Sequence, residues 1–165
     1  MRLFIALDID DNIRERIVRF LDGVRGFAPD ARWVKPESLH ITLKFIGEKS
    51  EEETEIIKRA LETITAKMFE INIRGYGFFP TSRMPRVFWI GIDPGKEVTA
   101  LAAAVDENLS ALGIRKEEHA FSPHLSLGVG RSPVRPANKG TTERTATSSA
   151  CRKNLQPCLL QSLVR

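Results

Sequence analysis

Hydrophobic and polar positions along the first 130 residues repeat with two different periods, one typical of strands and one typical of helices. Apolar residues that alternate with polar ones, or that follow one another without a break, predict strands at residues 2–9, 38–47, 69–79, 86–92 and 122–129. Apolar residues spaced three and four positions apart predict helices over residues 12–25, 50–68 and 96–112. The resulting order is strand, helix, strand, helix, strand, strand, helix, strand, which is typical of a mixed α+β domain.

Two of the predicted strands carry the same pair of polar residues. In "SLHITLKF" (residues 38–45) a histidine is followed two positions later by a threonine, and in "SPHLSLGV" (residues 122–129) a histidine is followed by a serine. Side chains on a strand point alternately to opposite faces. The core face of the first strand is expected to hold Leu39, Ile41, Leu43 and Phe45. The opposite face is expected to hold His40, Thr42 and Lys44.

The second strand is expected to place His124 and Ser126 together on one face. Each strand then presents an imidazole and a hydroxyl group about 6.5–7 Å apart. One imidazole can accept a proton while the other donates one, and the hydroxyl groups can stabilise a developing oxyanion. The two motifs therefore predict acid–base chemistry.

Two alternatives compete with this interpretation. A single histidine on a half-buried strand is more often structural than catalytic, but here two of only three histidines share one pattern. Two histidines could also bind zinc, although neither motif has a cysteine or carboxylate at ligand spacing. No metal ligand is therefore expected. The third histidine, His119, lies outside any such pattern and is expected at the surface.

Charge and composition argue against a uniformly basic binding surface. The net charge is +4, but residues 1–118 hold 18 Lys and Arg against 20 Asp and Glu, while residues 119–165 hold 7 against 1. The two cysteines are too few for a secreted disulfide framework, and no apolar run is long enough to span a membrane. A cytoplasmic protein is expected.

The last 35 residues differ in character from the rest. All 12 aromatic residues lie at or before Phe121, and large apolar residues are sparse beyond Gly130. This composition predicts a largely irregular basic tail over residues 131–165. Only residues 158–165 are expected to dock as a last strand.

The motifs "HITLKFIGE" and "FSPHLSLG", 84 residues apart and preceded by "RLFIALDI", closely resemble those of the 2H phosphoesterase superfamily. Within it, the chain resembles the RNA 2′,3′-cyclic phosphodiesterases, also called 2′-5′ RNA ligases. The resemblance covers residues 1–130 and includes "FFPTSRMPRVFWIGI" between the motifs. It implies a single bilobal α+β domain over residues 1–130, with two antiparallel sheets flanked by helices around a central cleft. The motifs occupy residues 40–43 and 124–127.

The resemblance also implies an activity and roles for individual residues. The family opens a terminal RNA 2′,3′-cyclic phosphate with water to leave a 2′-phosphate, without metal or other cofactor, and some members ligate 2′-5′ linkages reversibly. His40 is implied as the proton donor to the leaving 3′-oxygen and His124 as the general base. Thr42 and Ser126 are implied as ligands of the phosphate oxygens. Arg131 is the candidate for a family arginine that usually follows Gly128 directly; here Val129 and Gly130 intervene.

The resemblance leaves other functions open. The substrate could be another cyclic nucleotide or a 2′-5′ linkage. The chain could also be a non-catalytic RNA-end-binding protein with a defective second lobe. The expected partners are RNA ends with a 2′,3′-cyclic phosphate, with tRNA fragments among the candidates. A monomer with no membrane association is expected.

Overall fold

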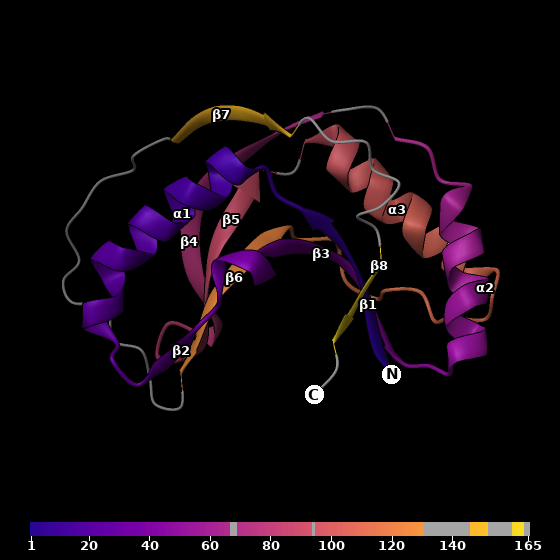
Figure 1. Ribbon diagram of the computed structural model, residues 1–165, viewed down its shortest axis with the longest axis horizontal. Coiled ribbons are helices and arrows are strands. Elements are labelled where there is room, and N and C mark those ends of the chain that lie inside the picture. The colour runs from indigo at the N-terminus through magenta and orange to yellow at the C-terminus, as the bar shows by residue number, and fades with distance from the viewer. Residues whose placement is uncertain (67–68, 94, 131–145, 152–159, 164–165) are drawn as a thin grey trace.

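The computed structural model describes most of the chain and defines eight strands and three α-helices there (Figure 1). Residues 67–68, 94, 131–145, 152–159 and 164–165 lie outside the described part. The strands are β1 (Arg2–Asp8), β2 (Ala31–Trp33), β3 (His40–Glu48), β4 (Phe69–Thr81), β5 (Met84–Asp93), β6 (His124–Gly130), β7 (Ala146–Cys151) and β8 (Leu160–Leu163). The helices are α1 (Asp11–Val24), α2 (Glu51–Glu62) and α3 (Lys96–Ser110), with short 3₁₀ helices η1 (Arg25–Phe27) and η2 (Pro36–Ser38).

The strands form two antiparallel sheets. One has the order β3-β1-β8 and the other has the order β2-β6-β5-β4-β7. Every strand predicted within the first 130 residues is present, and the α+β architecture with two antiparallel sheets is confirmed. The short strand β2 comes from the N-terminal half of the chain but pairs with β6 in the five-stranded sheet. The two halves of the sequence are therefore interleaved.

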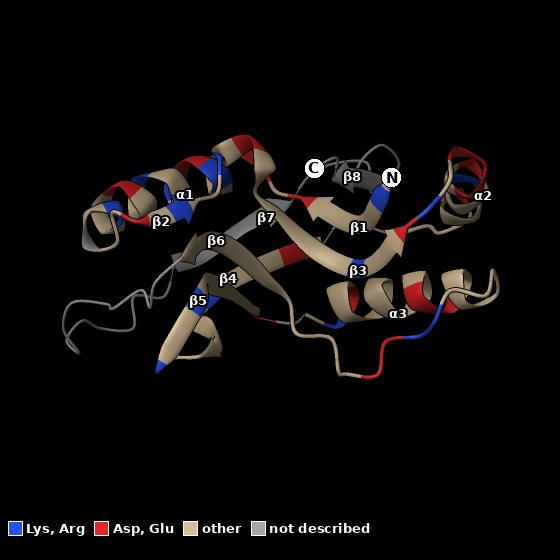
Figure 2. Cartoon of the chain, turned by 90° about the horizontal axis from the view of Figure 1, so that it is seen from below, with Lys and Arg blue, Asp and Glu red and all other residues tan. Residues whose placement is uncertain are grey.

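The helices flank both sheets, and α1 and α3 each pack against strands from the other half of the chain (Figure 1). Helix α1 packs on the five-stranded sheet, where the ring centroids of Phe20 and Phe88 lie 6.4 Å apart. Helix α3 contacts β3 and α2. In Figure 2 many of the charged residues lie on α1 and α2. Buried apolar residues of the three helices and of both sheets form one continuous core. No helix in the described part of the chain is long and apolar enough to cross a membrane.

The helix starts follow the sequence, whereas one helix end does not. Ser50 and Glu53 form a capping box at the start of α2, with the Ser50 hydroxyl accepting from the Glu53 backbone N–H at 3.2 Å. The prediction that this helix extends to about residue 68 is wrong, because α2 ends at Glu62. The next residues, Thr63-Ile64-Thr65, are all β-branched and favour helices poorly.

The tail contributes one strand to each sheet. Strand β8 pairs with β1 and falls in the stretch expected to form a last strand. Strand β7 pairs with β4, so the expectation of irregular structure does not hold for residues 146–151. An unpaired sheet edge presents backbone N–H and C=O groups that can recruit a strand without large apolar side chains. Composition alone therefore underestimates strand formation here.

Candidate active site

The first histidine strand, β3, contains a β-bulge directly after Thr42. Its pairing register with β1 shifts by one residue at Leu43. A one-residue shift exchanges the two faces of the following segment. Lys44 is accordingly only 2% exposed, whereas Phe45 is 70% exposed. The prediction that Lys44 shares a face with His40 while Phe45 enters the core is therefore wrong.

The second histidine strand, β6, has the same bulge at the same place. Its register with β5 shifts at Leu127, directly after Ser126. His124 and Ser126 are half-buried, as are His40 and Thr42. The repetition seen in the sequence thus extends to strand geometry, and both motifs present histidine and hydroxyl on one face.

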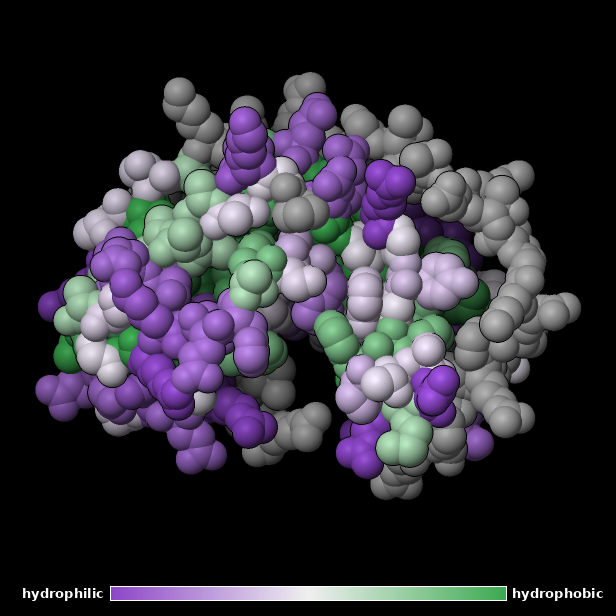
Figure 3. Space-filling view, turned by 180° about the vertical axis from the view of Figure 1, so that it is seen from behind, coloured by the Kyte–Doolittle hydropathy of each residue, from purple (hydrophilic) through white to green (hydrophobic). Residues whose placement is uncertain are grey.

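We call this surface the histidine face of each sheet, because it carries the histidine and the hydroxyl of that motif. Residues paired directly across neighbouring strands share a face. In the three-stranded sheet the histidine face includes Phe4, Ala6, Asp8, His40, Thr42 and Phe45. In the five-stranded sheet it includes Gly77, Phe79, Trp89, Gly91, His124 and Ser126. Strands β3 and β6 contact each other although they belong to different sheets. The space-filling view shows the molecule hollowed between its two halves (Figure 3).

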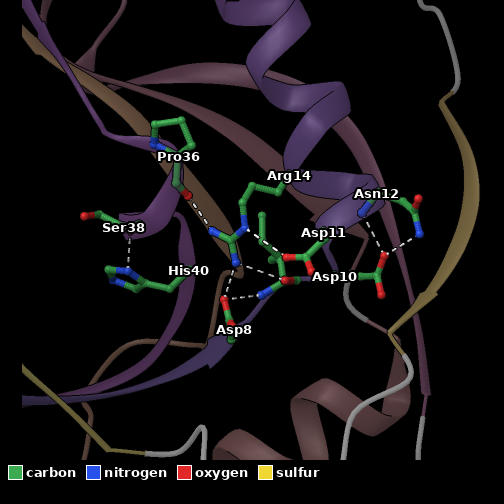
Figure 4. Close-up of polar contacts among 9 residues, drawn as sticks. Asp8, Asp10, Asp11, Asn12, Arg14, Pro36, Ser38 and His40 are labelled. Atoms are coloured by element: carbon green, nitrogen blue, oxygen red, sulfur yellow. Dashed lines mark hydrogen bonds and ion pairs between the residues drawn. The ribbon is translucent and has the colours of Figure 1, made fainter.

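Both imidazoles are held by the same hydrogen bond. Nδ1 of His40 lies 2.8 Å from the carbonyl oxygen of Ser38 (Figure 4), and Nδ1 of His124 lies 2.9 Å from the carbonyl oxygen of Ser122. A carbonyl oxygen only accepts, so Nδ1 carries a proton in each ring. Nε2 is then the nitrogen that can give or take a proton at a substrate. The two histidines therefore present equivalent, oriented atoms.

The electrostatic surroundings distinguish the two histidines. Burial lowers the pKa of His40, and the Ser38 carbonyl and the negative charge of Asp8 partly offset this effect. Asp8 is the residue on β1 paired directly with His40. The residue paired in the same way with His124 is Gly91, which carries no charge. Only the first imidazole therefore has a carboxylate at its paired position.

Arg14 of α1 holds this carboxylate in place (Figure 4). Its guanidinium lies 2.6 Å from Oδ1 of Asp8 and also donates to the carbonyl oxygens of Pro36 and Ile9. Pro36 begins the turn that supplies the Ser38 carbonyl to His40. Arg14 thus contacts both the carboxylate beside His40 and the turn that carries the Ser38 carbonyl. Neither Asp8 nor Arg14 was predicted from the sequence, where the only signal was an acidic residue at the end of a buried strand.

Comparison with known proteins identifies the family. The family model for LigT like Phosphoesterase matches residues 7–89, which is half of the chain. The chain belongs to the LigT-like phosphoesterase family. The expected membership in the 2H phosphoesterases is thereby confirmed.

Several known proteins are similar to the chain. An RNA 2′,3′-cyclic phosphodiesterase of Archaeoglobus fulgidus is 44% identical over 131 residues, which span 78% of this chain and 72% of the relative. A protein of the same name from Methanocaldococcus jannaschii is 37% identical over 78% of this chain and 70% of its own length. The crystal structure of E. coli LigT complexed with 3′-AMP matches with a TM-score of 0.71 and 27% identity. That match covers 90% of this chain and 82% of LigT.

The structure brings four of the five expected site residues of this LigT-like phosphoesterase to the histidine faces: His40, Thr42, His124 and Ser126. The fifth, Arg131, lies outside the described residues. Among the described residues, no group of three His, Cys, Asp or Glu side chains is placed to hold a metal ion. His119 is exposed, as expected.

Proposed function

We propose that this chain hydrolyses the terminal 2′,3′-cyclic phosphate of RNA to a 2′-phosphate and a free 3′-hydroxyl. The observation that carries the proposal is the repeated geometry: two half-buried histidines begin neighbouring strands, and each donates from Nδ1 to the carbonyl two residues earlier. Relatives named RNA 2′,3′-cyclic phosphodiesterase support the substrate, and the structure of E. coli LigT complexed with 3′-AMP supports a nucleotide ligand.

The proposed reaction is an in-line displacement at phosphorus. Nε2 of His124 takes a proton from water as its oxygen bonds to phosphorus, while the bond from phosphorus to the 3′-oxygen breaks. Nε2 of His40 gives its proton to the departing 3′-oxygen. Asp8 supports this assignment, because its negative charge favours the protonated form of His40 that an acid requires. The anionic phosphate of a bound substrate acts in the same direction.

The proposed role of Thr42 and Ser126 is to hold the phosphate. Each hydroxyl lies two residues after a histidine on the same face, so the two can donate to the non-bridging oxygens. Donors placed before the reaction stabilise charge that develops in the transition state. Arg131 is proposed as a further phosphate ligand on sequence grounds alone.

We propose that the protein acts as a cytoplasmic monomer on RNA ends, with tRNA fragments among its substrates. One chain carries both histidines, so a second copy is not needed to complete the pair. The cysteine content supports a reducing compartment, because two cysteines cannot form a disulfide framework.

The direct test is turnover of a short RNA that ends in a 2′,3′-cyclic phosphate, in excess EDTA. Both proton transfers are assigned to side chains of the chain itself, so we expect full activity with chelator present and a 2′-phosphate product identified by phosphorus NMR. A 3′-phosphate product would contradict the proposed direction of opening. Tight binding without turnover would identify an RNA-end-binding protein instead.

The Asp8→Asn variant is expected to shift the pH dependence of kcat/KM. The negative charge raises the pKa of His40, so its removal lowers that pKa further. Activity that needs protonated His40 is lost as the pH rises through this pKa, and the alkaline limb of the profile therefore moves to lower pH. The expected change is therefore confined to the limb that depends on the acid, His40.

Asp11→Asn is the matched control for this measurement. Asp11 also pairs with Arg14, at 3.5 Å, but its side chain is 79% exposed. We expect its profile to match that of the wild type. An unchanged alkaline limb in Asp8→Asn would show that Asp8 does not influence the acid.

A further inference from the structure

Two aromatic rings adjoin His124 on the histidine face of the five-stranded sheet. The rings of Phe79 and Trp89 are stacked with centroids 5.3 Å apart and an interplanar angle of 30°. The Phe79 ring meets the His124 imidazole edge-on at 5.1 Å, and the Trp89 ring lies 6.0 Å from the same imidazole. We call Phe79 and Trp89 the aromatic platform. Both rings of the platform therefore lie next to the His124 imidazole.

The Trp89 ring of the platform packs directly against Gly77. A Cβ atom at Gly77 would lie only 2.2 Å from Cζ2 of Trp89, so the indole rests against bare backbone. The indole N–H is buried and has no hydrogen-bond partner among the described residues. Shape rather than hydrogen bonding therefore holds the ring. Phe79, the outer ring of the stack, is 40% exposed and leaves an aromatic surface open to solvent.

The other histidine has no comparable surface next to it. The ring beside His40 is Phe4, at 4.8 Å, and Phe4 is only 4% exposed. Phe45 is 70% exposed on that histidine face, but its contact is with Phe4, at 6.2 Å. Among the described residues, His124 therefore has a solvent-exposed aromatic ring in direct contact with it, whereas the ring beside His40 is buried.

We propose that the aromatic platform stacks the terminal nucleobase of the substrate; this inference rests on the proposed function. In a nucleoside 2′,3′-cyclic phosphate the base and the phosphate are attached to the same ribose. A phosphate held at Nε2 of His124 therefore brings its base within reach of Phe79. Stacking on aromatic rings stabilises any base, because each has a π-face. The platform thus recognises a nucleobase without selecting its identity.

The first test compares substrates on the wild-type protein. Adenosine, guanosine, cytidine and uridine 2′,3′-cyclic phosphates are measured against a ribose 2′,3′-cyclic phosphate that lacks a base. We expect kcat/KM to be about 5- to 140-fold higher with a base than without one, because stacking contributes about 1–3 kcal/mol per base. The four nucleosides should differ from one another much less. Equal values with and without a base would overturn the proposal.

The second test assigns the effect to the platform. In Phe79→Leu the ratio of kcat/KM with base to that without base should fall toward one, and Phe79→Tyr should restore it. Gly77→Ala disturbs the stack from beneath by displacing the indole, and should lower the same ratio without removing a ring. A Phe79→Leu ratio equal to that of the wild type would overturn the assignment.

Tyr76→Leu is the matched control. Tyr76 lies on the same strand and is 63% exposed, but its ring packs against Phe88 at 6.1 Å on the opposite face. Its substrate ratio should equal that of the wild type. If Phe45→Leu lowered the ratio of kcat/KM with base to that without base, and Phe79→Leu left it unchanged, the base would bind at the three-stranded sheet. That result would refute the proposal that Phe79 and Trp89 stack the base. Failure of the proposed function is distinct, because the wild type would then open no cyclic phosphate of either kind.

Discussion

Replacing either motif histidine by alanine is expected to lower kcat by about 10²–10⁴-fold on a 2′,3′-cyclic phosphate. In the proposed mechanism, His40→Ala removes the proton for the leaving 3′-oxygen, and His124→Ala removes the base that activates water. The measurement is steady-state turnover at the pH optimum of the wild type. Both side chains are half-buried at the beginning of a strand, so the variants should fold. A wild-type rate in His40→Ala would refute the mechanism.

A modified substrate separates the two roles. When sulfur replaces the bridging 3′-oxygen, the leaving group departs as a thiolate and needs little help from an acid. We expect this substrate to recover most of the loss in His40→Ala and little of the loss in His124→Ala. The reverse pattern would exchange the two assignments. The control is His119→Ala, which changes the exposed third histidine and should keep the wild-type rate.

Replacing Asp106 by alanine is expected to destabilise the protein by roughly 3 kcal/mol, because it leaves a buried charge without its partner. Nζ of Lys44 is buried, 2.5 Å from Oδ1 of Asp106 on α3 and 2.8 Å from the carbonyl oxygen of Arg115. The measurement is the midpoint of urea unfolding at neutral pH. Replacing both partners, as in Lys44→Met with Asp106→Leu, should restore most of the stability, since no charge is then left buried.

The adjacent residue of α3 provides the control. Glu107 pairs with Lys116, but both side chains are more than half exposed, and Glu107→Ala should cost at most about 1 kcal/mol. Equal effects at Asp106 and Glu107 would show that Lys44 is not paired as described. Burial raises the pKa of Asp106, but hydrogen bonds from Lys44 and the Glu117 backbone N–H outweigh it and lower that pKa. The stabilisation is therefore present at neutral pH and is lost as the pH falls through the lowered pKa.

The Lys44 contact also shows where sequence reasoning failed. Strict alternation of side chains predicted that Lys44 lies beside His40. The alternation is observed from Leu39 to Leu43, but the bulge at Leu43 turns Lys44 to the opposite face. A bulge forms where two strands pair, and the partner strand of β3 is not encoded in the local pattern. The bulge in β6 escaped prediction for the same reason, although His124 and Ser126 precede it and were placed correctly.

The sequence by itself determined the parts of the protein that depend on local spacing. The strand and helix periods, the capping box at Ser50 and the shared face of each histidine and its hydroxyl all follow from neighbours within a few residues. The family membership belongs here too, because the two motifs in their apolar frames suffice to indicate it.

Tertiary structure alone decided the surroundings of the two motifs. Asp8 and Arg14 reach His40 through strand pairing and helix packing, and Phe79 and Trp89 reach His124 from two other strands. The sheet edges that β7 and β8 join likewise belong to strands far away in the sequence. Such contacts join residues that are distant along the chain, and they exist only once the chain has folded. The residues of the proposed acid–base pair are therefore set by the two motifs, while the groups that surround them are set by the fold.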